Sequence, residues 1–174
     1  MDVHFVLPDL RKLDALKSEA LSLPFFSDER PLRGALGLVD WRLCGRISRL
    51  QAAGVVDGHL GETVLVPARP RLTFEKVFLF GLGPRTSFDL DVYERVTERM
   101  LATLTQARVR ASVLALPGRA LGLVDATTAM EVFLRIAEKH PDHDDVTLVE
   151  DVEAQKAMLP IVERERRRAR ASVA

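Results

Sequence analysis

Residues 77–84 have the sequence "VFLFGLGP", in which an apolar run breaks off at Gly81 and Gly83. A run that is apolar on both faces is typical of a strand in a sheet covered by helices on both sides, because a half-exposed strand alternates apolar and polar residues. The glycines suggest either a loop that cradles a phosphate or the plain end of a strand. A dinucleotide fingerprint would need a third glycine where Thr86 stands, and Pro84 removes an N–H group that a phosphate could use. We therefore favour a strand end.

The segments on either side of this strand alternate between strand-like and helix-like patterns. Residues 3–7 form a short apolar run, and Asp9 can then cap a helix that reaches about Ala20. After the opening stretch, the patterns predict a helix over 89–107, a strand over 111–116, a helix over 124–140, a strand over 145–151 and a helix over 152–171. Such alternation predicts an α/β fold, a three-layer sandwich whose mixed, mostly parallel central sheet is flanked by helices.

The segment between the first helix and the opening stretch has less regular patterns. Residues 23–37 are rich in proline and glycine and predict a loop. Mixed helical spacing then predicts one helix over 39–50. Residues 55–67 are predicted to form a hairpin, because Asp57-Gly58 suits a tight turn and the residues before Pro67 are β-branched or apolar.

The composition indicates a single globular domain. Hydrophobic residues make up 47% of the 174 residues, and 25 basic side chains balance 25 acidic ones, so the net charge gives no sign of a nucleic-acid partner. The single Cys44 rules out an internal disulfide and a cysteine-based zinc cluster. Because the apolar runs are short and the N-terminus lacks a signal-peptide pattern, we expect a cytoplasmic protein without membrane contact.

A set of glycines and one acidic residue carries a resemblance to a known family. They are Gly54, Gly58, Gly61, Glu62, Gly81 and Gly83, together with Leu82 between the last two glycines. The first four form a G-x-x-x-G-x-x-G-E hairpin pattern and the last three end a strand, as in the N-terminal domain of the leucyl aminopeptidase (cytosol aminopeptidase) family. The chain resembles that domain over residues 1–150. Residues 151–174 are predicted to be a C-terminal helix with an Arg-rich end, part of the same domain.

The resemblance implies a fold similar to macro domains and a non-catalytic role in protein interaction or assembly. In that family, the peptidase machinery lies in a separate C-terminal domain with two metal ions, whose "NTDAEGR" signature does not occur here. We therefore expect no enzymatic activity, no cofactor and no metal. Two alternatives stay open: a macro-like domain that binds ADP-ribose or another nucleotide, and an accessory subunit of a separately encoded aminopeptidase.

Two candidate sites follow. The strand end at Gly81, Leu82 and Gly83 is the candidate ligand site, because open α/β sheets bind ligands beyond the carboxyl ends of their strands. The candidate interaction surface, for a protein partner or for self-association, combines Arg33, Trp41, Arg42, Arg46 and Arg49. On one helix, the last three arginines would line a single face. The alternative is a solvated helix face with Trp41 packed in the core.

Three further features favour structural roles. The cluster "HPDHDD" (140–145) matches no zinc or calcium spacing and predicts a polar turn. Cys44 is predicted to be a buried thiol on a helix. The C-terminal arginines could contact nucleic-acid phosphates, although the exposed end of a helix explains them as well. These arginines are Arg164, Arg166, Arg167, Arg168 and Arg170.

Overall fold

The apolar run of the opening stretch lies in strand β4 (Lys76–Gly81) of a computed structural model that describes residues 1–173, with the backbone alone at 169, 172 and 173. The other strands are β1 (Asp2–Val6), β2 (Ala20–Phe25), β3 (Thr63–Val66), β5 (Ala111–Leu114) and β6 (Asp145–Val149). Their order is β1-β6-β5-β2-β4-β3, and all neighbours are parallel except β3, which runs antiparallel to β4 at one edge. The predicted mixed, mostly parallel sheet is confirmed.

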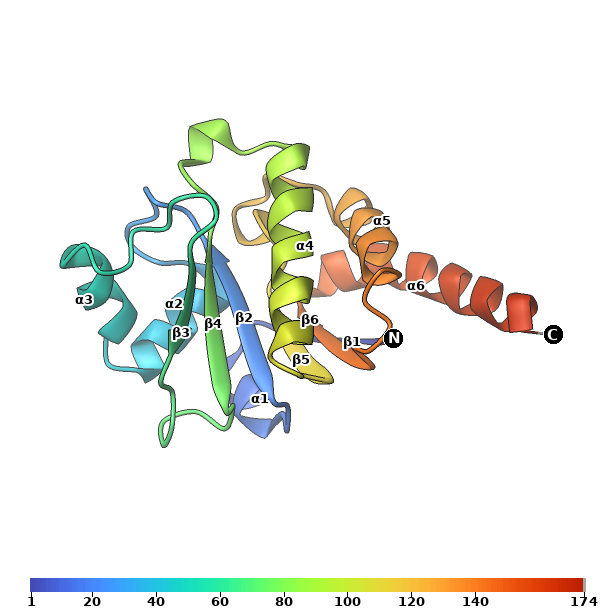
Figure 1. The fold of residues 1–174 in the computed structure, drawn as a ribbon, viewed down its shortest axis with the longest axis horizontal. Coiled ribbons are helices and arrows are strands. Elements are labelled where there is room, and N and C mark those ends of the chain that lie inside the picture. The colour runs from blue at the N-terminus through green and yellow to red at the C-terminus, as the bar shows by residue number, and fades with distance from the viewer. Residues whose placement is uncertain (174) are drawn as a thin grey trace.

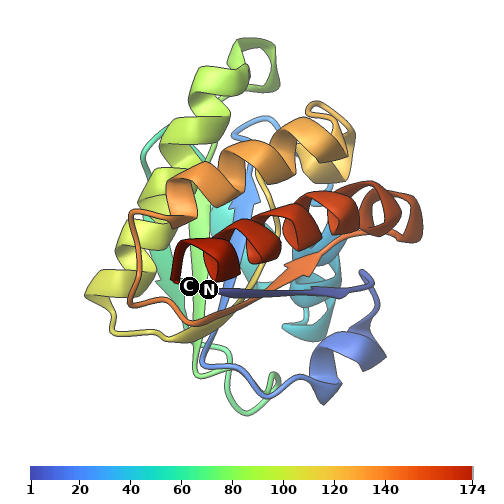
Figure 2. The ribbon, with the colours of Figure 1, turned by 90° about the vertical axis from the view of Figure 1, so that its right-hand side faces the viewer.

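Helices cover both faces of the sheet, as Figures 1 and 2 show. One face carries α4 (Leu90–Gln106), α5 (Ala126–Ala137) and α6 (Val152–Val173). The other face carries α1 (Leu10–Ala15), α2 (Gly34–Arg42) and α3 (Arg46–Ala52). Two short 3-10 helices, Arg85–Ser87 and Arg119–Leu121, follow β4 and β5. The predicted three-layer sandwich is therefore confirmed.

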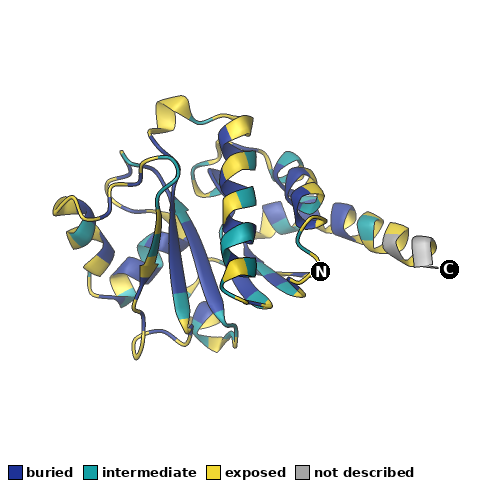
Figure 3. Ribbon diagram, viewed as in Figure 1, coloured by how far each residue is buried: buried dark blue, intermediate teal, exposed yellow. Residues whose placement is uncertain are grey.

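Strand β4 shows why its sequence is apolar throughout. Phe78 and Phe80 belong to the hydrophobic cluster beneath α4, α5 and α6, whereas Val77 and Leu79 belong to the cluster beneath α1, α2 and α3. All four side chains are buried, because helices cover the strand from both sides. Figure 3 shows this burial along β4 and β2, with exposed residues on the outer surfaces of the helices.

Helices α4 and α5 begin one and two residues after their predicted starts, and each has an aspartate at its N-cap. The Asp89 carboxylate accepts the N–H of Val92 at 2.9 Å, and the Asp125 carboxylate accepts the N–H of Thr128 at 2.9 Å. Each bond satisfies one of the N–H groups that a helix leaves without a partner in its first turn. The apolar stripe of each helix is buried against the sheet.

We expect Asp125→Ala to lower the free energy of unfolding by about 1 kcal/mol, because the first turn of α5 loses this acceptor. Bonds from Thr127 and Thr128 hold the pKa of Asp125 well below its usual range. A pKa lowered by folding stabilises the domain above the unfolded value, and this contribution is lost as the pH falls through the folded value. In urea denaturation, the difference in the free energy of unfolding between the wild type and the variant should be constant above about pH 5 and shrink below about pH 4. Asp125→Asn keeps an acceptor and is the control; an equal deficit in both variants would contradict the capping role.

Strand β2 corrects two predictions. The helix predicted to reach Ala20 ends at Ala15, and residues 20–25, predicted as the end of that helix and the start of a loop, form a central strand. The strand pairs with β4 along its whole length and with β5 as far as Ser22. Pro24 interrupts the strand pattern in the sequence. Pairing with two neighbouring strands, and the burial that comes with it, outweighs this local signal.

Two other elements differ from their predictions. The helix predicted over 39–50 is two helices, because the chain turns at Cys44 and Gly45 with φ angles of 56° and 73°. The hairpin joins β3 to β4 and does not lie within 55–67, whose first half is a loop. That loop cannot pair as a strand because the Glu62 carboxylate binds two of its N–H groups.

Helix α6 packs on α5 through its first half, where Met158, Ile161 and Val162 are buried. Its last turns extend away from the body of the domain, as Figure 1 shows. Within the described residues, no helix combines the length and the apolar character needed to cross a bilayer.

Candidate functional site

The candidate ligand site at the end of β4 has its N–H groups already occupied. Gly81, Leu82 and Gly83 all donate to backbone carbonyl groups. The acceptors are, in order, the carbonyl oxygens of Glu62 (2.9 Å), Phe25 (2.9 Å) and Gly58 (2.8 Å). A phosphate loop needs N–H groups that point outward toward the ligand. Here the N–H groups hold neighbouring loops together instead.

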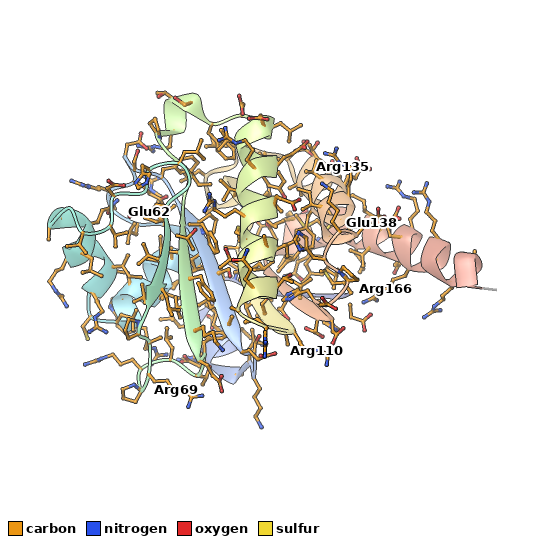
Figure 4. All side chains as sticks on the ribbon, viewed as in Figure 1. Glu62, Arg69, Arg110, Arg135, Glu138 and Arg166 are labelled. Atoms are coloured by element: carbon orange, nitrogen blue, oxygen red, sulfur yellow. The ribbon has the colours of Figure 1, made fainter. Side chains whose placement is uncertain are left out.

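Glu62, the last residue of the hairpin motif, ends the loop that precedes β3 (Figure 4). Its carboxylate accepts the N–H of Gly58 at 2.6 Å and the N–H of Asp57 at 3.2 Å. The loop lies so close to β4 that a Cβ atom at Gly81 would be 2.0 Å from the carbonyl oxygen of His59. The glutamate and the glycine therefore belong to one packing arrangement, which explains why they occur together in the sequence.

The loops after β2, β4 and β5 enclose a cavity of about 20 Å³ at the carboxyl edge of the sheet. A volume of this size holds about one water molecule, whereas ligand sites usually measure about 300–1,000 Å³. Glu29 lines the cavity and accepts the N–H groups of Phe26 (3.2 Å) and Arg33 (2.9 Å). Burial raises the pKa of Glu29, although these bonds oppose the rise. These loops therefore fill the carboxyl edge of the sheet, where a macro-like domain would have its ligand cleft.

A buried ion pair fixes the loop after β5. The Arg119 guanidinium binds the Glu150 carboxylate through two bonds, Nε to Oε1 at 3.1 Å and Nη2 to Oε2 at 3.0 Å. The side chains are 13% and 4% exposed. Arg119 also donates to the carbonyl oxygen of Val124 at 2.6 Å. Burial raises the pKa of Glu150, and the neighbouring guanidinium opposes this rise.

The candidate interaction surface contains a hollow of about 690 Å³ between α2, α3 and the loop after β3. Trp41 lines this hollow and is 71% exposed, so the alternative that packs it in the core is wrong. Cys44 also lines it and is exposed, which corrects the prediction of a buried thiol on a helix. The physical reason is the break between the two helices, which turns Cys44 outward at a position with positive φ.

The arginines of this surface come from two helices and do not line one helix face as predicted. Arg42 ends α2 and pairs with Asp14. Arg46 and Arg49 lie in α3, where they donate to the carbonyl oxygens of Pro67 (3.1 Å) and Cys44 (2.5 Å). Arg33 precedes α2 and lines the small cavity, so it does not belong to the hollow.

Two residues of the hollow were not among the sequence candidates. Arg71 follows β3 and donates from Nη1 to the Cys44 sulfur at 3.1 Å. Asp40 is 8% exposed, and its carboxylate accepts the N–H groups of Ile47 (2.8 Å) and Ser48 (3.1 Å) at the start of α3. Only the tertiary fold brings Arg71 to Cys44, so no local pattern in the sequence could have indicated it.

The histidines of the 140–145 turn have separate structural partners. His143 is buried, with Nε2 at 2.8 Å from the Ser112 hydroxyl and Nδ1 at 2.9 Å from the Val109 carbonyl oxygen. Burial lowers the pKa of His143. His140 contacts Glu98 at 3.1 Å on another side of the turn. These side chains point to different elements and do not converge on an ion.

Within the described residues, one set of potential metal ligands lies within 4.8 Å: Asp57, His59 and Glu62. The Asp57 carboxylate accepts the backbone N–H of His59 at 2.9 Å and lies 2.5 Å from His59 Nδ1; these two contacts lower the pKa of Asp57, and the second raises the pKa of His59. Backbone N–H groups occupy the Glu62 carboxylate. Hydrogen bonding within the loop therefore accounts for this arrangement.

The arginines at the end of α6 alternate with carboxylates. Four of them pair with acidic residues at 2.9–4.0 Å: Arg164 with Glu131, Arg166 with Asp2, Arg167 with Glu163 and Arg168 with Glu165. This pairing reduces the positive field that attracts a polyanion. Figure 4 shows Arg166 on the α6 side of the domain, away from Glu62 and Arg69 on the β3 side.

Known proteins resemble this chain in sequence. A profile of the cytosol aminopeptidase family, N-terminal domain, matches residues 23–137. A probable cytosol aminopeptidase of Thermosynechococcus vestitus is 31% identical over 125 residues, which are 72% of this chain and 24% of that protein. The chain thus spans about a quarter of the length of this relative.

Solved structures resemble the chain in fold. Tomato leucine aminopeptidase superposes with a TM-score of 0.60 and 11% identity, over 91% of this chain and 34% of that one. A Trypanosoma brucei macrodomain in complex with ADP-ribose superposes with a TM-score of 0.69 and 14% identity, over 92% and 68% of the two chains. At these identities the likeness concerns the fold, and it confirms the predicted macro-domain-like architecture.

Proposed function

The chain belongs to the family of cytosol aminopeptidase N-terminal domains, and from this premise we propose that it is a non-catalytic module that binds another protein through the α2–α3 surface. We define this surface as the hollow lined by Trp41, Cys44, Arg42 and Arg71, together with Arg46 and Arg49 of the adjoining helix α3. The observation that carries the proposal is the exposure of Trp41, at 71%, inside a hollow.

The residue types of this surface support protein binding. Tryptophan and arginine dominate the binding energy of protein interfaces, because they bury a large area and offer several directed donors. An exposed tryptophan leaves a large apolar surface in contact with water. A partner that covers this surface would gain the free energy of its burial. The apolar neighbours Pro31 and Leu32 line the same hollow.

The filled cleft at the carboxyl edge also supports protein binding over nucleotide binding. A macro-like domain that binds ADP-ribose needs an open site at the carboxyl edge, and here that site measures about 20 Å³. The likeness to the macrodomain bound to ADP-ribose favours nucleotide binding as a second candidate. The occupied N–H groups of the strand end favour the protein-binding role over it.

The partner to test first is a separately encoded aminopeptidase, in which case this chain would be an accessory subunit in the cytoplasm. The relative from Thermosynechococcus vestitus is a probable cytosol aminopeptidase about three times as long as this chain, since the 125 matched residues are 24% of it. A second copy of this chain is the other partner to test.

Site-directed photocrosslinking in the producing organism tests the proposal. Benzoylphenylalanine would replace Trp41, and the control would carry it at Leu159, which is 47% exposed on α6. We expect a discrete adduct from position 41 and none of the same mass from position 159, with mass spectrometry identifying the partner and its crosslinked residue. Identical adducts from both positions, or none from position 41, would overturn the assignment of the surface.

A further inference from the structure

The hollow also indicates the chemistry of the bound segment. We infer that the α2–α3 surface binds an acidic peptide segment, in which an apolar side chain enters the hollow and flanking carboxylates contact Arg46, Arg49 and Arg71. This inference rests on the proposed protein-binding function and adds the nature of the partner to it.

Among the residues whose side chains are described, the three arginines have no acidic partner. In the described part of the chain, no carboxylate lies within 4.0 Å of their guanidinium groups, whose acceptors are the Pro67 carbonyl oxygen and the backbone and sulfur of Cys44. Neutral acceptors leave each positive charge uncompensated. Charge-assisted bonds from arginine to carboxylate are about twice as strong as bonds between neutral groups. A carboxylate that replaced these acceptors would therefore be favoured.

Two carboxylates near the hollow do not cancel this charge. Asp40 lines the hollow but is 8% exposed, and its oxygens accept N–H groups of α3. Asp14 pairs with Arg42 at the edge, so that these two charges compensate each other. The exposed groups at the hollow are thus predominantly cationic, and electrostatic complementarity selects an acidic segment.

The shape of the site favours a peptide over a nucleic acid. The hollow of about 690 Å³ is lined by Pro31, Leu32 and Trp41, which suits one or two apolar side chains. Binding of single-stranded nucleic acid uses several aromatic residues on which successive bases stack, and Trp41 is the one aromatic residue among the described residues that line the hollow. Arg71 lines the hollow, and Arg49 binds the carbonyl oxygen of Cys44, which lines it too.

The chain provides two reporters for a direct test, because its only tryptophan and its only cysteine both line the hollow. The probe is a capped peptide with three glutamates on each side of one leucine, and the matched control replaces every glutamate with glutamine. We expect the glutamate peptide to change the Trp41 emission with saturation at low salt, and to bind at least about tenfold more tightly than the glutamine peptide. Raising the salt to about 0.5 M should weaken binding, since it screens the exposed charges.

Charge reversal then places the binding on this surface. The variant Arg46→Glu/Arg49→Glu/Arg71→Glu should weaken binding at least about tenfold. The variant Arg164→Glu/Arg167→Glu/Arg168→Glu changes the net charge equally on α6 and should bind within about twofold of the wild type. Circular dichroism checks that both variants fold. If the first variant does not fold, the alkylation rate of Cys44 in the wild-type protein is measured instead. Alkylation by iodoacetamide should slow at least about fivefold when the glutamate peptide is bound, and the glutamine peptide should not slow it.

The outcomes separate the two proposals. Equal binding of both peptides, equal effects of both triple variants, or unchanged Cys44 alkylation would overturn the acidic-segment inference. Tighter binding of an oligothymidine strand would replace it with a nucleic-acid surface. If crosslinking at position 41 captures a protein while the glutamate peptide fails, the protein-binding function stands without the acidic segment. If the crosslinking itself fails, the proposed function fails.

Discussion

Replacement of Arg119 by alanine is expected to lower the free energy of unfolding by about 3–5 kcal/mol. The variant would leave the Glu150 carboxylate, which is 4% exposed, without the two bonds that it accepts at 3.0 and 3.1 Å. An uncompensated charge in this environment must either stay ionised at a high cost or take up a proton. Urea denaturation followed by circular dichroism at neutral pH would measure the loss.

The pH dependence of this loss identifies its cause. Burial raises the pKa of Glu150, and removal of the guanidinium removes a contribution that lowers it, so the pKa should rise further in Arg119→Ala. A raised folded pKa means that stability is fully present below the unfolded value of 4.5 and is lost as the pH rises through the folded value. The deficit of the variant should therefore grow between about pH 5 and pH 8.

A double variant provides the matched control. Arg119→Met/Glu150→Leu replaces the pair with apolar side chains and should be much less destabilised than Arg119→Ala, because no charge is left buried alone. A deficit of the same size in both variants, independent of pH, would show that packing and not charge burial is responsible.

The second large effect is expected at Gly81. Gly81→Ala should lower the free energy of unfolding by about 3 kcal/mol, at the upper end of the usual cost of overpacking. The new Cβ would lie 2.0 Å from the His59 carbonyl oxygen and 2.8 Å from the Gly58 carbonyl carbon. Both neighbours are backbone atoms, so a side-chain rotation cannot relieve the clash, and the loop that Glu62 holds would have to move.

Gly54→Ala is the control for this prediction. Gly54 has a φ angle of 69°, and no atom lies within 4 Å of the point that a Cβ would occupy there, so the replacement tests backbone strain without a clash. We expect a cost of about 1 kcal/mol. Denaturation curves for both variants, recorded under the same conditions, would separate the two effects. A Gly81→Ala variant as stable as Gly54→Ala would mean that the close approach of the two backbones has little energetic weight.

The sequence predicts the elements whose periodicity is strong and whose ends carry capping residues. Strand β4 is apolar on both faces, and α4 and α5 combine an apolar stripe with Asp89 or Asp125 at the N-cap. The resemblance in the hairpin and strand-end glycines predicts the family and the fold, and two of these glycines, Gly58 and Gly81, lie where two backbones meet.

Strand β2 could not be predicted from the local pattern, because a proline fits a central strand only where the neighbouring strand does not need its N–H group. That condition depends on the tertiary pairing. The Ser22 carbonyl accepts the N–H of Ala115, so the backbone polar groups of Ser22 face β5. Pro24, two residues later, faces the same side, where the pairing of β5 with β2 has already ended at Leu114. The missing N–H of Pro24 therefore costs no ladder bond, while β4 continues to pair with β2 on the other side.

The sequence identifies the residue types of the candidate interaction surface but not their geometry. The sequence identifies Trp41, Arg42, Arg46 and Arg49 as a distinctive group, yet it predicts one continuous helix. The turn at Cys44 and Gly45 depends on the Asp40 carboxylate, which accepts N–H groups at the start of α3. This contact spans seven and eight residues, beyond the range of a helical pattern.

The closed cleft at the carboxyl edge has a consequence for any small molecule that would bind there. Such a ligand would need a rare open conformation, so its apparent dissociation constant would equal the intrinsic one divided by the population of that open state. The contacts of Glu29 with Phe26 and Arg33 and the pair of Arg119 with Glu150 set this population. Substitutions that loosen these contacts would raise the population, and with it the affinity, while lowering the stability. The same contacts thus oppose both local opening of the cleft and unfolding of the domain, so affinity for such a ligand and stability would change in opposite directions.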